Sequence, residues 1–138
     1  MKKLVVCLFA ATLSFTSVNA LSTIKSNYSI VKEVPEKTIC IKNAQATDAT
    51  AYFSTTTQFY FEVFKPGSKV DLTAIIEKLN HTEGVQSCTP GSVTGDYFGI
   101  TLTLKTKKDK TWFAKVCKDA GLGHIKINSN DAIAIEKL

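Results

Sequence analysis

The chain has 138 residues, of which 44% are hydrophobic, and it carries a formal net charge of +5. This length is typical of one domain with an extension. All 17 basic residues are lysines. Because the arginine fork is the side chain best suited to bidentate phosphate recognition, its absence argues against a nucleic-acid partner.

The first twenty residues have the features of a secretory signal peptide. Lys2 and Lys3 precede an apolar run, residues 4–15, and small residues lead up to Ala20. The apolar run is shorter than the roughly 20 residues of a membrane-spanning helix. We therefore expect cleavage after Ala20, with a retained anchor as the weaker alternative. The mature chain, residues 21–138, is then secreted or periplasmic, of bacterial type, and free of the membrane.

Residues 21–57 give a weak pattern, and we assign them to an N-terminal extension. Within them, residues 28–31 and 38–42 are predicted as short strands. Residues 43–57 are rich in Ala and Thr without a clear period, and they fit either a short helix or a loop. The remaining residues, 58–138, form the main predicted domain.

The main domain begins with a strand followed by a helix. Residues 58–64 alternate in the way of a strand, and Pro66 and Gly67 end it. Ser68 or Asp71 is then the expected N-cap of a helix. Its apolar stripe has helical spacing and consists of Leu72, Ile75, Ile76 and Leu79.

A hairpin and a second helix follow. Residues 85–93 read as an edge strand because Pro90 lacks a ladder N–H. Residues 97–105 alternate most clearly and form the partner strand. A helix is expected over residues 110–120, with Gly121 ending it. Its predicted buried residues are Trp112, Phe113, Val116, Cys117 and Ala120.

The C-terminal part is predicted as strand. Residues 124–128 form the fourth strand of the domain, and residues 132–136 alternate as an added edge strand. The order βαββαβ predicts an α+β, ferredoxin-like fold. In this fold two helices cover one face of an antiparallel sheet.

Over about residues 59–128 the chain resembles the heavy-metal-associated (HMA) superfamily of copper chaperones and mercury-binding proteins. The resemblance rests on IEKL at residues 76–79, EGV at residues 83–85 and KDAGL at residues 118–122. It implies the ferredoxin-like fold.

The metal site of that family does not carry over. The family binds soft metals through a CxxC pair in its first loop. Counted back from Gly84, the two positions are Ser68 and Asp71; counted from Pro66-Gly67, they are Val70 and Thr73. Neither alignment supplies a thiol, so we assign no metal, no cofactor and no catalytic residue.

The three cysteines of the mature chain are Cys40, Cys88 and Cys117. An odd number permits one disulfide and one free thiol, but wide spacing favours three buried thiols. A soft-metal carrier of copper, zinc or mercury is the alternative function. Its unconventional ligands would be Cys88, Cys117, His81 and His124.

The function we expect is binding rather than catalysis. If helices cover one face of the sheet, the other face is open to a partner, most simply another exported protein. The sequence contains no nucleophile elbow, phosphate loop or HExxH motif that would favour an enzyme. The candidate interaction face consists of Tyr60, Glu62, Tyr97, Thr101, Thr103, Lys126 and Asn128.

Overall fold

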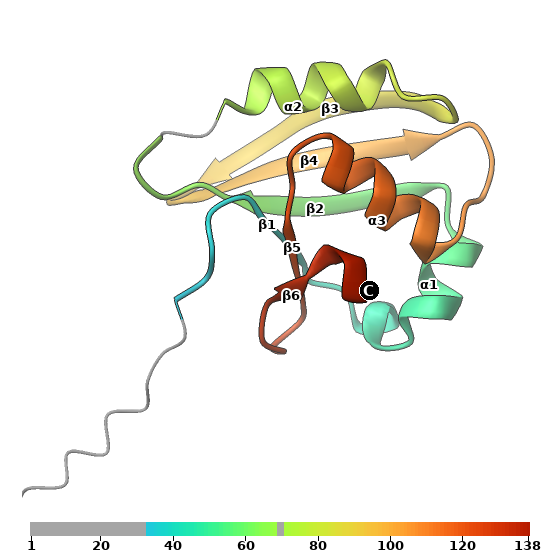
Figure 1. The fold of residues 1–138 in the computed structure, drawn as a ribbon, viewed down its shortest axis with the longest axis horizontal. Coiled ribbons are helices and arrows are strands. Elements are labelled where there is room, and N and C mark those ends of the chain that lie inside the picture. Colours follow the sequence, from blue (N-terminus) through green and yellow to red (C-terminus); the bar gives the residue numbers. More distant parts are fainter. Residues whose placement is uncertain (1–32, 69–70) are drawn as a thin grey trace, which may run out of the picture. The chain divides into compact units, whose positions relative to one another are not determined.

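A mixed six-stranded sheet and three α-helices make up the described part of the chain (Figure 1). The computed structural model describes residues 33–68 and 71–138, so the expected signal cleavage site and the strand expected at residues 28–31 lie outside it. The elements are β1 (Thr38–Ile41), α1 (Ala49–Thr55), β2 (Gln58–Phe64), α2 (Leu72–Asn80), β3 (Val85–Thr94), β4 (Tyr97–Leu104), α3 (Lys110–Asp119), β5 (His124–Ile127) and β6 (Ile133–Ala134). Short 3-10 turns occupy Ala44–Thr47, Pro66–Ser68 and Ile135–Lys137.

The strand order is β3-β4-β2-β1-β5-β6, which is not ferredoxin-like. A ferredoxin-like sheet would pair β2 directly with β5, whereas here β1 lies between them. Thr38 of β1 is opposite Phe64 of β2 on one side and His124 of β5 on the other. The β1–β5 pair is parallel and the other pairs are antiparallel, so the prediction of an antiparallel sheet is wrong.

The inserted strand β1 is buried along its whole length. All four of its residues, TICI, are shielded from solvent, as expected for a central strand. These residues were assigned to an extension from the sequence. In the structure β1 belongs to the same sheet as the strands within residues 58–138.

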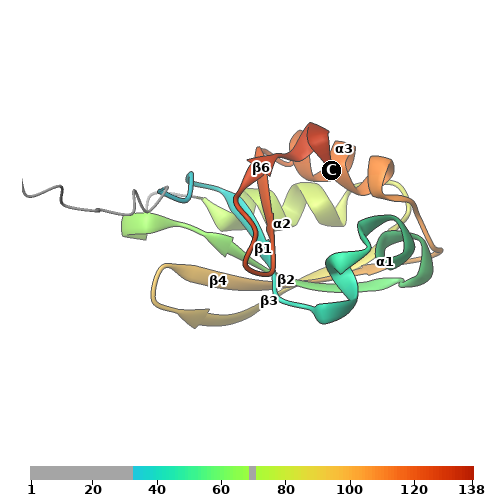
Figure 2. The same cartoon turned by 90° about the horizontal axis from the view of Figure 1, so that it is seen from below.

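Helices α2 and α3 lie on the same side of the sheet (Figure 2). Helix α1 packs against α3 on this side, because the ring of Phe53 in α1 lies 4.7 Å from that of Phe113 in α3. Phe53 also stacks on Phe59 of β2 at 5.5 Å between ring centroids. Three helices rather than two therefore enclose the core, and aromatic rings from α1, β2 and α3 form its centre.

The helix ends follow local rules. Asp71 is the N-cap of α2, where its Oδ1 accepts a hydrogen bond from the Ala74 amide at 3.1 Å. Asp109 caps α3 in the same way, with 2.8 Å to the Trp112 amide. After α3, Gly121 has a φ of 96°, a left-handed conformation that ends the helix.

Two expectations about individual residues need correction. Trp112 and Ile76 are only partly buried and pack at the margin of the core, whereas Phe113 and Ile75 point into it. The predicted edge strand at residues 132–136 is shortened to Ile133–Ala134. Ile135 turns inward instead, and its amide donates a hydrogen bond to the carbonyl oxygen of Gly123 at 3.0 Å.

Within the described ranges, no helix is both long enough and apolar enough to span a bilayer.

The three cysteines of these ranges are free and buried, in agreement with the prediction of three buried thiols.

Candidate functional site

The sheet has one face turned away from α2 and α3, which we call the open face (Figure 2). Along β2, Phe59, Phe61 and Val63 enter the core, so the intervening residues point to the open face. Strand pairing then assigns the neighbours, since Tyr60 lies opposite Thr101 and Gln58 opposite Thr103. The residues that point to the open face are Gln58, Tyr60, Glu62, Phe64, Tyr97, Gly99, Thr101, Thr103, Thr38, Cys40, His124 and Lys126. Thr38 and Cys40 are nevertheless shielded from solvent on this side, with exposed fractions of 0% and 6%.

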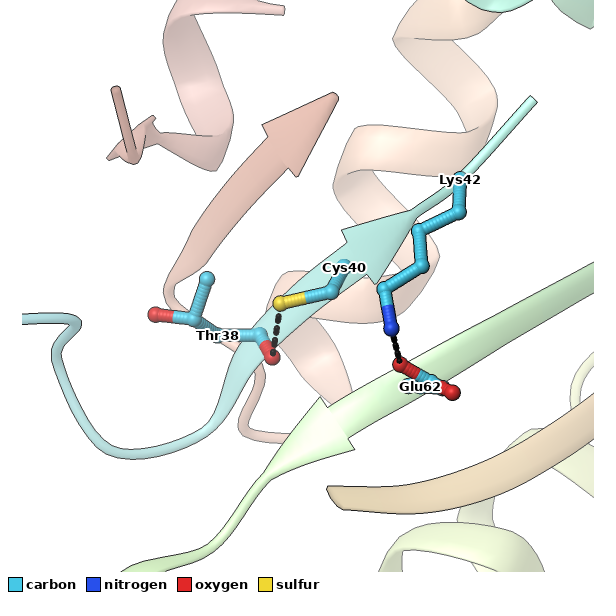
Figure 3. A network of polar contacts seen from close by, with 4 residues as sticks. All are labelled: Thr38, Cys40, Lys42 and Glu62. Atoms are coloured by element: carbon cyan, nitrogen blue, oxygen red, sulfur yellow. Dashed lines mark hydrogen bonds and ion pairs between the residues drawn. The ribbon is translucent and has the colours of Figure 1, made fainter. Parts of the chain in front are cut away.

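A charged pair crosses the open face from β1 to β2 (Figure 3). Nζ of Lys42 lies 2.7 Å from Oε2 of Glu62, whose side chain is only 16% exposed. The hydrogen bond with Glu62, together with the charge of that carboxylate, raises the pKa of Lys42. The ammonium of Lys42 also lies 5.3 Å from the ring centroid of Tyr97. The positive charge of Lys42 is thus offset by a nearly buried carboxylate.

Cys40 lies beside this pair, between Glu62 and Lys126 in neighbouring strands. It is 6% exposed, and its Sγ is 4.0 Å from the carbonyl oxygen of Thr38 (Figure 3). Burial raises its pKa more than the charge of Lys126 lowers it. Cys40 is therefore a neutral thiol at physiological pH, not a nucleophilic thiolate.

A hollow of about 360 Å³ opens at one end of this face, where the chain passes from β1 into the following turn. We call it the Tyr60 hollow, and it is lined by Lys42, Asn43, Tyr52, Gln58, Tyr60 and Thr101. Burial raises the pKa of Tyr52, although a hydrogen bond with the Asn43 side chain opposes the shift. The hollow therefore brings hydroxyl and amide groups together beside an aromatic ring.

Tyr60 forms one wall of the hollow by leaning across the sheet. Its hydroxyl lies 2.8 Å from the position that a Cβ atom on Gly99 would occupy. Gly99 is opposite Glu62, so the Tyr60 side chain runs diagonally from β2 over β4. Because Gly99 has no side chain, the ring lies low on the sheet, while the residue remains 51% exposed.

The residues predicted for the interaction face are arranged as follows. Tyr60, Glu62, Tyr97, Thr101, Thr103 and Lys126 all project from the open face. Asn128 has a different position, just after β5, with a φ of 53°. Its Oδ1 accepts from the Asn43 amide at 2.9 Å, and its Nδ2 donates to the Asn43 carbonyl oxygen at 3.0 Å. Asn128 thus holds one rim of the Tyr60 hollow rather than offering its own side chain.

Sequence reasoning missed several residues of the hollow. Gln58 could have been found, because it shares a face with Tyr60 by simple alternation. Lys42, Asn43 and Tyr52 carried no such signal, since they reach the open face only through the insertion of β1 and the position of α1.

Of the alternative metal ligands, the two thiols lie close enough to interact, since Cys88 contributes after burial to the raised pKa of Cys117. Cys88 and Cys117 are buried in the core on β3 and α3. His81 lies at the exposed end of α2, with Nδ1 2.8 Å from the carbonyl oxygen of Glu77. His124 is on β5, opposite Thr38. Among the residues that the structure describes, no three His, Cys, Asp or Glu side chains gather as a metal site would require.

A second hollow, of about 280 Å³, lies on the helix side and is lined by Lys110, Thr111, Ala114, Lys115, Lys118, Glu136 and Leu138. Its polar groups largely satisfy each other. Lys118 pairs with Glu136 at 2.7 Å, and Lys110 donates to the carbonyl oxygen of Leu138 at 2.8 Å. In the Tyr60 hollow, Lys42 and Asn43 are likewise engaged, with Glu62 and the Gln45 amide respectively, and the side chains of Gln58 and Thr101 are the polar groups left for a ligand.

Comparison with known proteins adds no family to this description. The chain matches no family model, no curated protein and no solved structure.

Proposed function

We propose that the protein is an exported binding module whose ligand or partner lies on the open face of the sheet. The observation that carries this proposal is the half-exposed ring of Tyr60, held low over Gly99 beside a polar hollow. Exposed aromatic rings with neighbouring hydrogen-bonding groups are a common feature of binding surfaces. Export is proposed from the signal-like residues 1–20.

The chemistry of the face favours binding over catalysis. A general base or nucleophile needs a charge state that can change near neutral pH. Here Glu62 is occupied by Lys42 at 2.7 Å, and burial keeps Cys40 protonated. These groups support the structure of the face, while Tyr60 and the hollow beside it offer contacts to a ligand.

A second proposal concerns the fold and goes beyond the observed α+β architecture. We propose that the segment from β2 to β5 is a ferredoxin-like unit related to the HMA superfamily, with β1 added between its first strand, β2, and its last strand, β5. The element order β2-α2-β3-β4-α3-β5 supports it, as does the position of α2 and α3 on one side of the sheet. The loop before α2 has no thiol pair, so the proposed relationship implies a binding role without the metal of that superfamily.

Crystals of the purified protein soaked in small organic probe molecules test the proposal. We expect ordered probes on the open face, in the Tyr60 hollow. Thr101→Arg should fill the hollow and displace them, whereas Thr103→Arg, on the same strand and face but outside the hollow, is the matched control. Probes bound only at the hollow between α3 and Leu138, with none on the open face, would contradict the proposal.

A further inference from the structure

The Tyr60 hollow has the chemistry of a site for a sugar. We propose that it binds a neutral saccharide, with one pyranose ring placed against Tyr60. The inference rests on the proposed function, because it names the ligand class of the same open face. It is carried by three features of the hollow: a flat aromatic surface, a lining that both donates and accepts hydrogen bonds, and the absence of excess charge.

The flat surface is the ring of Tyr60. Its hydroxyl lies over Gly99, so the ring leans toward the backbone of β4. The residue is nevertheless 51% exposed, which leaves the outward side of the ring to a ligand. The face of an aromatic ring carries partial negative charge. The C–H groups on one side of a pyranose carry partial positive charge and are flat enough to lie on it.

The lining matches hydroxyl groups. Each sugar hydroxyl donates one hydrogen bond and accepts others, and the side-chain amide of Gln58 can do both. The hydroxyl group of Thr101 has the same capacity, whereas Tyr52 is only 7% exposed and its hydroxyl is hydrogen-bonded to the Asn43 side chain. The side chain of Asn43 is partly used within the protein, because its Oδ1 accepts a hydrogen bond from the Gln45 amide at 2.9 Å. Among the described residues, the side chains of Gln58 and Thr101 have no hydrogen-bond partner, and the bonds of Gln58 to Thr56 are made by its backbone. Both side chains can therefore form hydrogen bonds with a ligand in the hollow.

The charge of the hollow favours a neutral ligand. Lys42 is its single ionised lining residue, and Glu62 balances it at 2.7 Å. An anionic ligand such as a nucleotide would have to compete with Glu62 for the ammonium. A neutral sugar needs only a hydrogen bond from it. The volume of about 360 Å³ lies at the lower end of the range of small-ligand sites, about 300–1,000 Å³, and suits one ring rather than a long chain.

Titration of the isotope-labelled protein with methyl glycosides of glucose, galactose, mannose and N-acetylglucosamine, followed by NMR, tests the inference. We expect saturable shifts in the amides around Tyr60, Asn43 and Thr101 with at least one of them. Thr101→Val should weaken that binding by about two- to tenfold through loss of one hydrogen bond. Thr103→Val, on the same strand and face but outside the hollow, should leave it unchanged.

The aromatic surface has its own pair of variants. Tyr60→Phe keeps the flat ring and should retain most of the affinity, whereas Tyr60→Leu should weaken binding by about two- to tenfold. Thermal melting of each variant shows that the fold is retained.

Adenosine is titrated in the same way as a comparison probe. The saccharide proposal would be overturned if no glycoside moved these amides, if Thr101→Val bound the glycoside as tightly as the wild type, or if adenosine bound more tightly than every glycoside. If adenosine or another probe still binds at the open face, the proposed function stands and only the ligand class is wrong. If no probe binds there, both proposals fail.

Discussion

The hydroxyl of Tyr60 lies 2.8 Å from where the Cβ atom of an alanine at position 99 would be. The Tyr60 side chain from β2 thus occupies the space that the missing side chain of Gly99 leaves on β4. Removal of either partner should change the surface that the ligand contacts as well as the stability of the sheet.

Gly99→Ala should therefore destabilise the protein. The added methyl group meets the Tyr60 hydroxyl and also the backbone of Ser92, whose oxygen would be 3.1 Å away. Overpacking of this kind costs about 1–3 kcal/mol. Gly123→Ala is the matched control, because nothing lies within 4 Å of its added methyl group. Urea denaturation should show a loss for the first variant and none for the second; equal stability of the two would contradict the close fit of Tyr60 over Gly99.

Neighbouring residues on the same helix should differ in how much they contribute to stability. Ile75 is buried and Ile76 only partly so, and the same contrast holds for Phe113 and Trp112. Truncation of buried Ile or Phe to Ala costs about 2–5 kcal/mol. Ile75→Ala and Phe113→Ala should each lose clearly more free energy of unfolding than Ile76→Ala and Trp112→Ala. The reverse order in denaturation curves would show that the helices are rotated relative to the structure.

Asn128 should matter for stability through two hydrogen bonds and a left-handed backbone. Asn128→Ala loses both bonds to Asn43 and leaves, at a φ of 53°, a residue that adopts the left-handed conformation less readily than Asn. Asn128→Gly loses the same bonds but relaxes the backbone. We expect a loss of about 1–3 kcal/mol for the alanine variant and a smaller loss for the glycine variant, measured by thermal or chemical denaturation. Asn130→Ala is the control, and an effect as large as that of Asn128→Ala would refute the specific role.

The core thiols predict how stability depends on pH. Burial raises the pKa of Cys88 to about 11, and burial also raises that of Cys117. The unfolded chain releases its thiol protons near the ordinary pKa of about 8.5, while the folded protein retains them. The unfolded state then binds fewer protons, so stability should fall as the pH rises from about 8.5 toward 11.

Denaturation midpoints measured across this range check the thiol effect. The decline should be shallower in Cys88→Ala, since that variant lacks one of the thiols responsible. A decline of the same steepness in the variant and the wild type would assign the effect to other groups.

Much of the secondary structure could be predicted because its signals are local. The alternation of residues 58–64 predicted the bounds of β2 correctly, and α3 and its end at Gly121 were also recognised, although Trp112 was wrongly assigned to the buried stripe. The role of Pro90 in an edge strand was predicted correctly as well, since β3 lies at one end of the sheet. Each of these features is decided within a few residues of the chain.

The sheet order could not be obtained in the same way. Insertion of β1 between β2 and β5 depends on contacts between residues far apart in sequence, such as Ile39 with Val63 and Ile125. The four-residue strand is buried on both faces and so has no alternation to recognise. For the same reason, the sequence predicted Tyr60 and Thr101 on one open face but neither their pairing nor the hollow that Lys42, Asn43 and Tyr52 complete.

A signal for α1 was present in the undecided segment. Asp48 precedes the helix, and its Oδ1 accepts a hydrogen bond from the Ala51 amide at 3.1 Å. An acidic N-cap followed by aromatic residues four and five positions later is consistent with a short helix that buries Tyr52 and Phe53. The Ala- and Thr-rich composition around it obscured that pattern.

The central claim is that the open face of the sheet is the binding surface. Backbone amide shifts of the isotope-labelled protein, recorded during addition of a mixed library of small polar and aromatic compounds, test it most directly. We predict that the largest shifts lie in residues 40–43, 58–62 and 97–103. The largest shifts along residues 110–118, with the open face unchanged, would contradict the claim.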